Sequence, residues 1–382
     1  MFGCHVASVF RRLQRLCAFY GGQPQYIGCS ATIANGEEHF GKLIPMVGED
    51  GTLCSGGGSS AVPAAKESRV AYSRRTGRPI VVSKDGSPSG PKLFGIWNPP
   101  ELDEELQTSW SPTQQPGASV HRVSSYSEAA TVLAELVTHG LRTICFVLVR
   151  SVAELVLKRT RERLPTRLKN KVAAYRGGYL AERRREIESE LSDGRLTAVV
   201  ATNALELGLD IGQLDATVHV GFPGTMGSLW QQAGRGGRGT RPSVAIFIAL
   251  DSPLDQALIQ NPAKLLQREV EAAIVDPYNL HILKDHLCAA AHELPLQLPK
   301  GASSLQSQAA STLGQHGGLD VELFGKLALT DQVEELMASG ELVLKDDGRV
   351  GFWSKTTPAK KVSIRNMDAI SYKVIDLKRE SA

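Results

Sequence analysis

Two arginines in a glycine-rich segment are the residues whose types and spacing best suit chemistry. Arg235 and Arg238 lie in Gln231–Arg238 (QQAGRGGR), three positions apart, so that on a helix they would share one face. Glycines at 234, 236, 237 and 239 allow close backbone approach at a cost in helix stability. Two permanently charged guanidinium groups suit a polyphosphate whose negative charge builds during phosphoryl transfer. Taken alone, the segment could also be a surface loop that has no chemical role, which is the weaker of the two readings.

A second segment, Thr202–Ile211 (TNALELGLDI), carries groups that can bind a nucleotide. A strand ending at Ala201 delivers Thr202 to the edge of a sheet, and Gly208 permits a turn before Asp210. A hydroxyl and backbone amides at a strand end can hold a phosphate. A carboxylate a few residues later can reach a ribose hydroxyl. The alternative reading is a strand followed by a capped helix without a binding role.

Alternating strands and helices position these segments. From Ser127 onward, short β-rich runs are separated by amphipathic helices, which predicts βαβ units and an α/β fold with a parallel sheet covered on both faces. Ligands of such sheets bind at the carboxyl ends of the strands, here the loops after 149, 175, 201 and 220. The expected helices span 127–139, 151–164 and 180–192, and the expected strands span Thr143–Val149, Lys171–Tyr175, Leu196–Ala201, Ala216–Val220 and Ser243–Ala249.

The sequence on either side of this alternating region shows other patterns. Residues 6–20 place apolar side chains at helical spacing with arginines on the other face, and Gln25–Cys29 reads as a short strand before Ser30-Ala31-Thr32. A helix is expected over Glu37–Leu43 and another around 280–291. Near the C-terminus, an Asp-Gly turn between alternating runs predicts a β-hairpin beside a helix, which suggests a winged-helix-like module. Its expected elements are helix Asp331–Ser339 and strands Glu341–Lys345 and Arg349–Ser354.

Composition excludes several classes of protein. Six scattered cysteines form no C-x-x-C pair, so we expect neither a disulfide scaffold nor a metal site, and a reducing compartment fits best. Cys29 and Cys145 lie in apolar runs and are expected to be buried. No apolar run has the length of a membrane span, and the N-terminus has no apolar core of the signal-peptide kind, so the protein reads as soluble and intracellular.

A basic cluster stands out against the formal net charge of +3. Between Lys158 and Arg185 there are eleven Lys and Arg residues against two acids, Glu162 and Glu182. Such a cluster can be a solvated helix face or can follow a phosphate backbone, and the sequence leaves both readings open.

The two motifs together give the chain a family resemblance. It resembles the superfamily-two DEAD/DEAH-box helicases, with SAT at 30–32 similar to their motif III, ATNALELGLDI at 201–211 to motif V and QQAGRGGR to motif VI. More narrowly, it is similar to the RecQ-like DNA helicases of the MrfA/YprA type and their eukaryotic nuclear branch. The similarity covers nearly the whole chain apart from 48–78, and the supporting segments are Phe94–Pro100, His139–Phe146, Tyr175–Arg184, Leu214–Gln232, Arg241–Phe247 and Cys288–Leu294.

The resemblance implies roles for individual residues. Arg235 and Arg238 would contact the γ-phosphate of ATP from a second RecA-like lobe, with Gln231 linking ATP to motion. Asp210, with Gly208, would approach the ribose. Ser30 and Thr32 would couple hydrolysis to lobe movement. The backbone of single-stranded or forked DNA would be contacted by Thr202, Arg150, Ser151, Arg176, Gly177 and Gly178.

Two parts that such an ATPase needs are absent from the 382 residues: a phosphate loop ending in Lys-Ser/Thr and an acidic strand end for Mg²⁺. Gly36–Leu43 (GEEHFGKL) has the Gly-Lys spacing of such a loop, but Leu43 cannot ligate magnesium. We therefore expect an N-terminally truncated chain that is inactive alone. Its expected parts are a remnant of the first RecA-like lobe at 1–47, a flexible insertion and interlobe linker at 48–120, the second RecA-like lobe at 121–272, a helical connector at 273–318 and the winged-helix-like module at 319–376.

Three functional hypotheses follow from these observations. The first is part of an ATP- and Mg²⁺-dependent 3′→5′ DNA helicase of genome repair, located in the nucleus. The second is a non-catalytic nucleic-acid-binding protein that keeps the basic lobe and the winged module. The third, a structural scaffold with a degenerate sheet, leaves the paired arginines unexplained. DNA-stimulated ATPase activity separates the first two hypotheses, and the resemblance leaves the oligomeric state open.

Overall fold

The computed structural model describes residues 1–45, 79–83, 86–88, 90–101, 122–207, 211–237, 240–298 and 319–364. The chain divides into two compact units. The sheet unit comprises Ala31–Ala34 and Lys84–Ala272, and the helical unit comprises Met1–Ser30, Asn35–Ser83 and Ala273–Ala382. Each unit has its own hydrophobic core.

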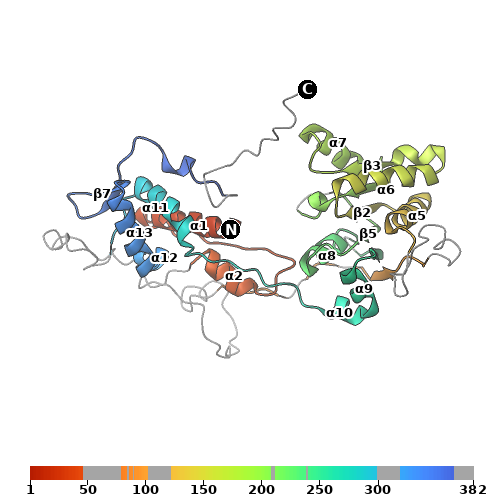
Figure 1. The fold of residues 1–382 in the computed structure, drawn as a ribbon, viewed down its shortest axis with the longest axis horizontal. Coiled ribbons are helices and arrows are strands. Elements are labelled where there is room, and N and C mark those ends of the chain that lie inside the picture. The colour runs from red at the N-terminus through yellow and green to blue at the C-terminus, as the bar shows by residue number, and fades with distance from the viewer. Residues whose placement is uncertain are drawn as a thin grey trace, which may run out of the picture. The chain divides into compact units, whose positions relative to one another are not determined.

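A parallel sheet of six strands forms the centre of the sheet unit, in the order β1-β6-β5-β2-β4-β3 (Figure 1). The α/β fold predicted from the alternating pattern is therefore confirmed, and the predicted strand ends differ from the observed ones by at most two residues. The strands are β1 (Lys92–Trp97), β2 (Thr143–Val147), β3 (Val172–Tyr175), β4 (Ala198–Ala201), β5 (Ala216–Val220) and β6 (Ser243–Ile248).

Helices cover both faces of this sheet, and the side chains of each strand alternate between two cores. Cys145 of β2 packs in a core with α5 and α6, whereas its neighbours Ile144 and Phe146 pack in a core with α7. A third cluster joins α8 to β6. The helices of the unit are α5 (Ser125–Thr138), α6 (Arg150–Arg163), α7 (Ala181–Ser192), α8 (Met226–Ala233), α9 (Pro253–Gln260) and α10 (Pro262–Gln267), with 3-10 turns η1 (Thr166–Lys171) and η2 (Asn203–Leu205).

Strand β1 lies inside the stretch 48–120 that the sequence predicts to be an insertion and linker. It pairs in parallel with β6, with Lys92 opposite Ser243 and Trp97 opposite Ile248. Phe94 packs against Trp230 of α8, their ring centroids 5.7 Å apart. The apolar run LFGIW is long enough for an edge strand, and only its pairing with a segment 150 residues later in the chain reveals it.

The helical unit combines helices with a two-stranded antiparallel hairpin, β7 (Leu342–Leu344) and β8 (Val350–Phe352), which confirms the predicted hairpin. Its core gathers Leu283 and Leu287 of α11 with Phe324 and Val333 from the segments that follow. The other elements are α1 (Phe2–Phe19), α2 (Gly36–Leu43), α11 (Leu280–Glu293), α12 (Leu319–Phe324), α13 (Lys326–Ala338) and the 3-10 turn η4 (Pro358–Lys360). Among the described residues, no helix has the length and apolar character that crossing a bilayer requires.

Helix α1 buries two of the arginines that its periodicity places on a polar face, and that placement is wrong. Arg15 is 2% exposed and pairs with Asp320, whose Oδ2 lies 3.1 Å from Nη2 of Arg15. Its Nη1 also donates to the carbonyl of Ala290 at 3.0 Å. Arg11 donates through Nε to the carbonyl of Leu323 at 2.7 Å, and burial lowers the pKa of its guanidinium. Both charges are tolerated because each finds buried acceptors.

The short strand predicted at Gln25–Cys29 does not form. These residues take no regular structure and have no strand partner in the described part of the chain. Ile27 is 83% exposed and Cys29 is exposed, so the expected burial of Cys29 is also wrong. A run of β-forming residues becomes a strand only where another strand satisfies its backbone groups. Cys145, by contrast, is buried in β2 as expected, and burial raises the pKa of its thiol to about 12.

Candidate functional site at the carboxyl edge of the sheet

Three neighbouring strands, β2, β4 and β3, bring polar residues to one edge of the sheet. Because the strands are parallel, their carboxyl ends lie together. Arg150 and Ser151 are the first two residues of α6, just beyond β2, and both are exposed. Thr202 directly follows β4, and its backbone N–H donates to the carbonyl of Tyr175 at the end of β3, at 3.3 Å. The structure therefore gathers the residues that the sequence assigns to these loops.

The turn after β3 is held by contacts of Arg176. Its Nε donates to Oε1 of Glu154 at 3.0 Å, and its guanidinium lies over the Tyr179 ring, 4.8 Å from the centroid. The hydroxyl of Tyr179 donates to the same carboxylate oxygen at 2.7 Å. The hydrogen bond to Glu154 raises the pKa of Arg176 above its usual value. A Cβ at Gly178 would lie 3.0 Å from Nη1 of Arg176, so glycine gives the guanidinium its space.

The same turn approaches α6. A Cβ added at Gly177 would lie 3.7 Å from Nη2 of Arg150, which places the Arg150 guanidinium beside the turn. Two cations from different loops thus lie near one another at the carboxyl edge, where an extended polyanion could contact both.

Arg235 is fixed just beyond the end of α8. Its Nε and Nη2 both donate to the backbone carbonyl of Glu206, at 3.0 and 2.5 Å, and its side chain is half-buried. Helix α8 ends at Ala233, so the argument that Arg235 and Arg238 share a helical face is wrong. Four residues beyond the helix, Gly237 has a φ of +77°, and a Cβ there would lie 2.2 Å from Oγ of Ser243, so this position requires glycine.

Glu206 also joins the two motif segments through its carboxylate. Oε1 accepts from the Ser228 hydroxyl at 2.6 Å and Oε2 accepts from Nε2 of Gln232 at 3.0 Å. Because Gln232 donates to Glu206 through its amide nitrogen, its oxygen is the acceptor for Nδ1–H of His219 at 3.2 Å. Nε2 of His219 then accepts from the Thr217 hydroxyl at 3.0 Å. Glu206 thus contacts the motif VI segment through both its carboxylate and its backbone carbonyl.

Gln231 makes a contact that joins two distant parts of the sequence. Its Nε2 donates to Oγ1 of Thr32 within the sheet unit. The expected coupling residue Thr32 is therefore beside the expected linking residue Gln231. Ser30 is exposed and belongs to the helical unit. Gly208, Asp210 and Arg238 lie outside the described residues.

Two parts of the chain match protein families. Residues 128–240 match the helicase conserved C-terminal domain, and residues 275–367 match the winged helix domain of the ATP-dependent helicase HRQ1. The chain is 35% identical over 379 residues to the ATP-dependent helicase YprA of Bacillus subtilis, covering 98% of this chain and 41% of that protein. It is 36% identical over 310 residues to the ATP-dependent helicase HRQ1 of Saccharomyces cerevisiae, covering 78% of this chain and 25% of that protein.

Solved structures agree with these matches. The crystal structure of the helicase MrfA bound to DNA and AMPPNP superimposes with a TM-score of 0.73 at 34% identity, covering 95% of this chain and 42% of that one. The chain belongs to the superfamily-two helicases of the MrfA/YprA type. It spans less than half the length of these relatives. Within this family, the sheet unit is the RecA-like lobe predicted from the two motifs, followed by a winged helix.

Sequence reasoning missed three polar residues of the site: Glu206, His219 and Gln232. Glu206 and Gln232 stand inside the two family motifs, and each is buried and hydrogen-bonded to other polar groups. His219 is a polar residue in the middle of the buried strand β5, which is itself a signal, since such a group needs hydrogen-bond partners. His219 also stacks on Phe146, with ring centroids 5.8 Å apart.

The burial of His219 predicts that the sheet unit loses stability in mild acid. Burial is the main cause that lowers the pKa of His219 from 6.5 to about 4. The unfolded chain therefore binds a proton that the folded chain excludes, so this contribution is full above pH 6.5 and is lost as pH falls toward 4. Between pH 7 and pH 5 we expect the free energy of unfolding to fall by about 2 kcal/mol. Hydrogen exchange of β5 in increasing urea, for the wild type and for His219→Gln at both pH values, isolates the effect in the sheet unit. An equal pH dependence in the two proteins would contradict it.

Proposed function

We propose that this chain supplies the second motor lobe and a winged-helix module of an ATP-dependent DNA helicase. The observation that carries the proposal is the position of Arg235, held by Glu206 at the sheet edge where parallel α/β folds bind ligands. The names of the relatives support it: YprA and HRQ1 are ATP-dependent helicases, and MrfA has been crystallised with DNA and AMPPNP. Binding of single-stranded or forked DNA, unwinding with 3′→5′ polarity, a role in repair and a nuclear location rest on the family resemblance.

In this proposal Arg235 and Arg238 meet the γ-phosphate of an ATP held by another lobe. The double hydrogen bond to Glu206 fixes the plane of the Arg235 guanidinium before ATP arrives, so little reorganisation is needed when charge develops. By the family resemblance, Asp210 with Gly208 would approach the ribose. When bound, ATP supplies the free energy that drives lobe movement, and the contact of Gln231 with Thr32, beside Ser30, transmits it.

The residues of this chain fit one side of an ATP site. Arg235 suits a polyphosphate, but the described residues contain no group of His, Cys, Asp or Glu side chains that could hold Mg²⁺. The 382-residue sequence also has no phosphate loop of the Lys-Ser/Thr kind. We therefore propose that the chain alone binds DNA without hydrolysing ATP.

In the same proposal, residues that follow the strands contact the phosphate backbone of DNA. Arg150, Ser151 and the Arg176–Gly178 turn present cations, a hydroxyl and backbone amides along one edge, whereas Thr202, directly after β4, is buried at 6% exposed. These groups contact phosphates and sugars without reading bases. A single strand lying across this edge would meet the groups that follow β2 and β3, on either side of β4.

Replacing both edge arginines is expected to weaken single-strand binding. In Arg150→Gln/Arg176→Gln, two phosphate contacts are lost, so the slope of log K against log salt should fall by about 1.4 and affinity by about tenfold near 0.1 M salt. Fluorescence anisotropy with a labelled oligonucleotide measures both quantities. The matched control is Lys264→Gln/Arg268→Gln, which removes two exposed cations elsewhere on the same unit. A double edge variant that binds like this control would refute the assignment.

The second hypothesis, a nucleic-acid-binding protein without motor function, shares this edge. It is favoured by the fact that Arg150 and Arg176 are positioned by the protein itself, so that DNA binding needs no nucleotide. It gives no role to Arg235, which lies at the end of a different element. ATP hydrolysis that depends on Arg235 would therefore separate the two hypotheses.

A further inference from the structure

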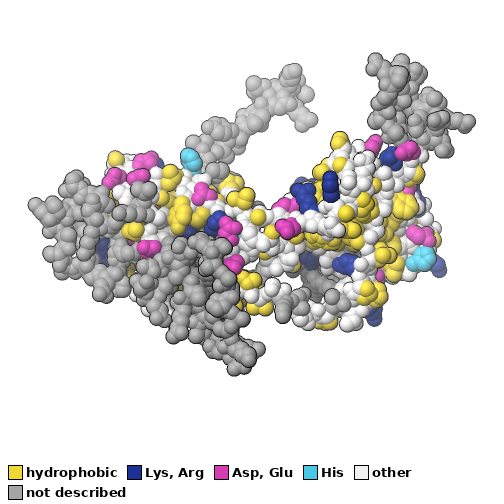
Figure 2. All heavy atoms as spheres, turned by 90° about the horizontal axis from the view of Figure 1, so that it is seen from below, with side chains coloured by type: hydrophobic (Ala, Val, Ile, Leu, Met, Phe, Trp, Pro, Cys, Tyr) yellow, Lys and Arg dark blue, Asp and Glu magenta, His cyan; other side chains and the backbone are white. Residues whose placement is uncertain are grey.

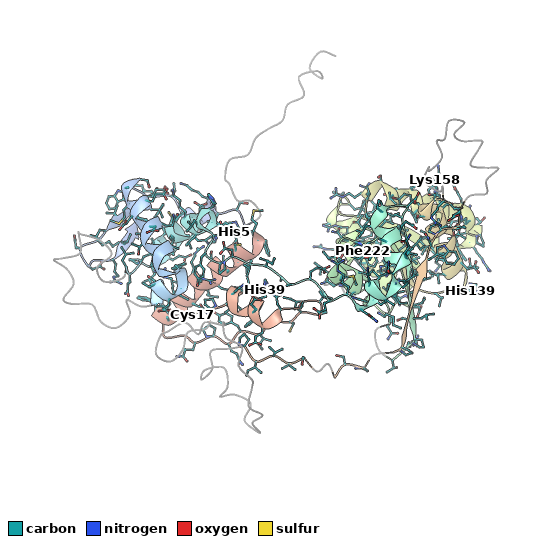
Figure 3. All side chains as sticks on the ribbon, turned by 60° about the horizontal axis from the view of Figure 1, so that its bottom comes forward. His5, Cys17, His39, His139, Lys158 and Phe222 are labelled. Atoms are coloured by element: carbon teal, nitrogen blue, oxygen red, sulfur yellow. The ribbon has the colours of Figure 1, made fainter. Side chains whose placement is uncertain are left out.

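One strongly charged surface of the sheet unit takes no part in the proposed site. The basic tract 158–171 contains seven cations, Lys158, Arg159, Arg161, Arg163, Arg167, Lys169 and Lys171, and one acid, Glu162. It covers the C-terminal part of α6 and the turn η1. Every one of its cations is exposed or half-exposed. Figure 3 labels Lys158 on the outside of this unit, and Figure 2 shows Lys and Arg side chains among the apolar ones on the face in view.

The arginines of the tract donate hydrogen bonds to uncharged groups. Arg163 donates to the hydroxyls of Ser127 and Thr131 on α5, at 2.8 and 3.1 Å. Arg159 donates to the Ser124 hydroxyl at 3.4 Å, and Arg161 donates to the backbone carbonyl at the start of β3 at 2.7 Å. In the described part of the unit, the ion pairs of arginines lie elsewhere, as in Arg176 with Glu154 and Arg183 with Glu186. The positive charge of the tract is therefore not offset by carboxylates bound to it.

Most of the tract lies away from the carboxyl edge. Helix α6 begins with Arg150 next to the end of β2 and runs back along the sheet, while η1 leads directly into Val172, the first residue of β3. Arg163 is thirteen residues after Arg150, which at 1.5 Å per residue is roughly 20 Å along the helix axis. The part of the tract from Arg163 to η1 is therefore separate from the strand ends, whereas Lys158, eight residues after Arg150, lies nearer to them.

We infer that the basic tract 158–171 is a second contact for the phosphate backbone of nucleic acid, separate from the carboxyl edge. The inference rests on the proposed function, because it concerns the DNA on which the motor would act. Arginine, lysine and hydroxyl groups are the set that binds phosphate and sugar oxygens. A shallow hollow of about 300 Å³ lies beside three of its cations, Lys158, Arg161 and Lys169, and is also lined by the side chains of Glu154 and Glu162.

An acidic protein is the less suitable partner. Protein interfaces are anchored by aromatic and aliphatic side chains that enter pockets. The tract offers none: Leu164 is buried, Leu168 packs against the core, and no large exposed hydrophobic residue lies between 158 and 171. A surface of cations and hydroxyls without apolar anchors matches a regular polyanion.

Two tract variants test the inference. Arg159→Gln/Arg163→Gln removes cations that also bond to α5, whereas Lys158→Gln/Arg167→Gln removes cations at exposed positions, so a folding defect in the first leaves the second informative. The 382-residue chain is titrated into labelled duplex DNA and labelled single-stranded DNA at several salt concentrations. For each variant we expect about tenfold weaker binding to the probe that contacts the tract, with a salt slope lower by about 1.8 for duplex or about 1.4 for single strand. The probe affected shows which form of DNA supplies the phosphates.

The control is again Lys264→Gln/Arg268→Gln, which changes the net charge equally. Tract variants that bind both probes like this control would overturn the inference and leave an acidic protein surface as the partner of the tract. If the proposed function itself were wrong, the DNA-binding measurements would give a different result. In that case Arg150→Gln/Arg176→Gln would also leave binding unchanged, whereas failure of the inference alone leaves the edge variant weakened.

Discussion

Arg235→Ala is expected to lower DNA-stimulated ATP hydrolysis by about 10³-fold, because an arginine that reaches the transferring phosphoryl group stabilises charge that appears only in the transition state. The activity requires a phosphate loop, so the test uses a chimera of Bacillus subtilis YprA in which the matching stretch is replaced by residues 1–382. Binding of DNA by the chimera should be unchanged, since Arg235 is not at the strand ends assigned to DNA.

The control for this substitution is Arg268→Ala, an exposed arginine of the same unit. Hydrolysis should be lost in Arg235→Ala and retained in Arg268→Ala. Equal activity in the two chimeras would mean that the glycine-rich segment does not contact ATP. That result would favour the second hypothesis, a nucleic-acid-binding protein without motor function.

Arg15→Ala is expected to destabilise the helical unit by about 3–5 kcal/mol, the cost of leaving one partner of a buried ion pair behind. The side chains of Arg15 and Asp320 are only 1% and 7% exposed, and Nε of Arg15 lies 2.5 Å from Oδ1 of Asp320. Without the arginine, the carboxylate keeps the backbone N–H of Gln297 as a partner but loses its counter-charge. The carbonyls of Ala290 and Leu294 lose their side-chain donor as well.

Hydrogen exchange of α11 in increasing urea measures this loss for the helical unit, because unfolding of a chain with two units is not a single transition. Arg12→Ala is the matched control on the same helix, since its pair with Glu293 is more exposed, at 12% and 27%. We expect a loss below about 1 kcal/mol there. The double variant Arg15→Met/Asp320→Leu should recover much of the stability. A loss from Arg15→Ala no larger than that from Arg12→Ala would refute the account of this ion pair.

The sequence was most informative where local pattern and tertiary structure agree. Strand β5 was predicted with its observed ends because Ala216–Val220 alternates apolar residues with Thr217 and His219 and is followed by a turn that contains glycine and proline. The loop residues Arg150, Arg176 and Thr202 could be placed at one edge because the topology of a parallel sheet fixes where its strands end.

Features that depend on distant partners could not be predicted from the sequence. Strand β1 exists because β6 pairs with it, and Gln25–Cys29 stays irregular because no described strand does. The burial of Arg15 depends on Asp320, 305 positions away, and a helical periodicity cannot distinguish a paired arginine from a solvated one. Likewise, nothing local shows that the carbonyl of Glu206 holds Arg235.

The central claim is that this chain carries the arginine side of an ATP site and that the phosphate-loop side must come from another lobe. The most direct test compares DNA-stimulated ATP hydrolysis by the 382-residue chain with hydrolysis by the YprA chimera that contains it. We predict no hydrolysis above background for the chain and robust hydrolysis for the chimera, abolished by Arg235→Ala. Hydrolysis by the chain alone, or hydrolysis by the chimera that survives Arg235→Ala, would contradict the claim.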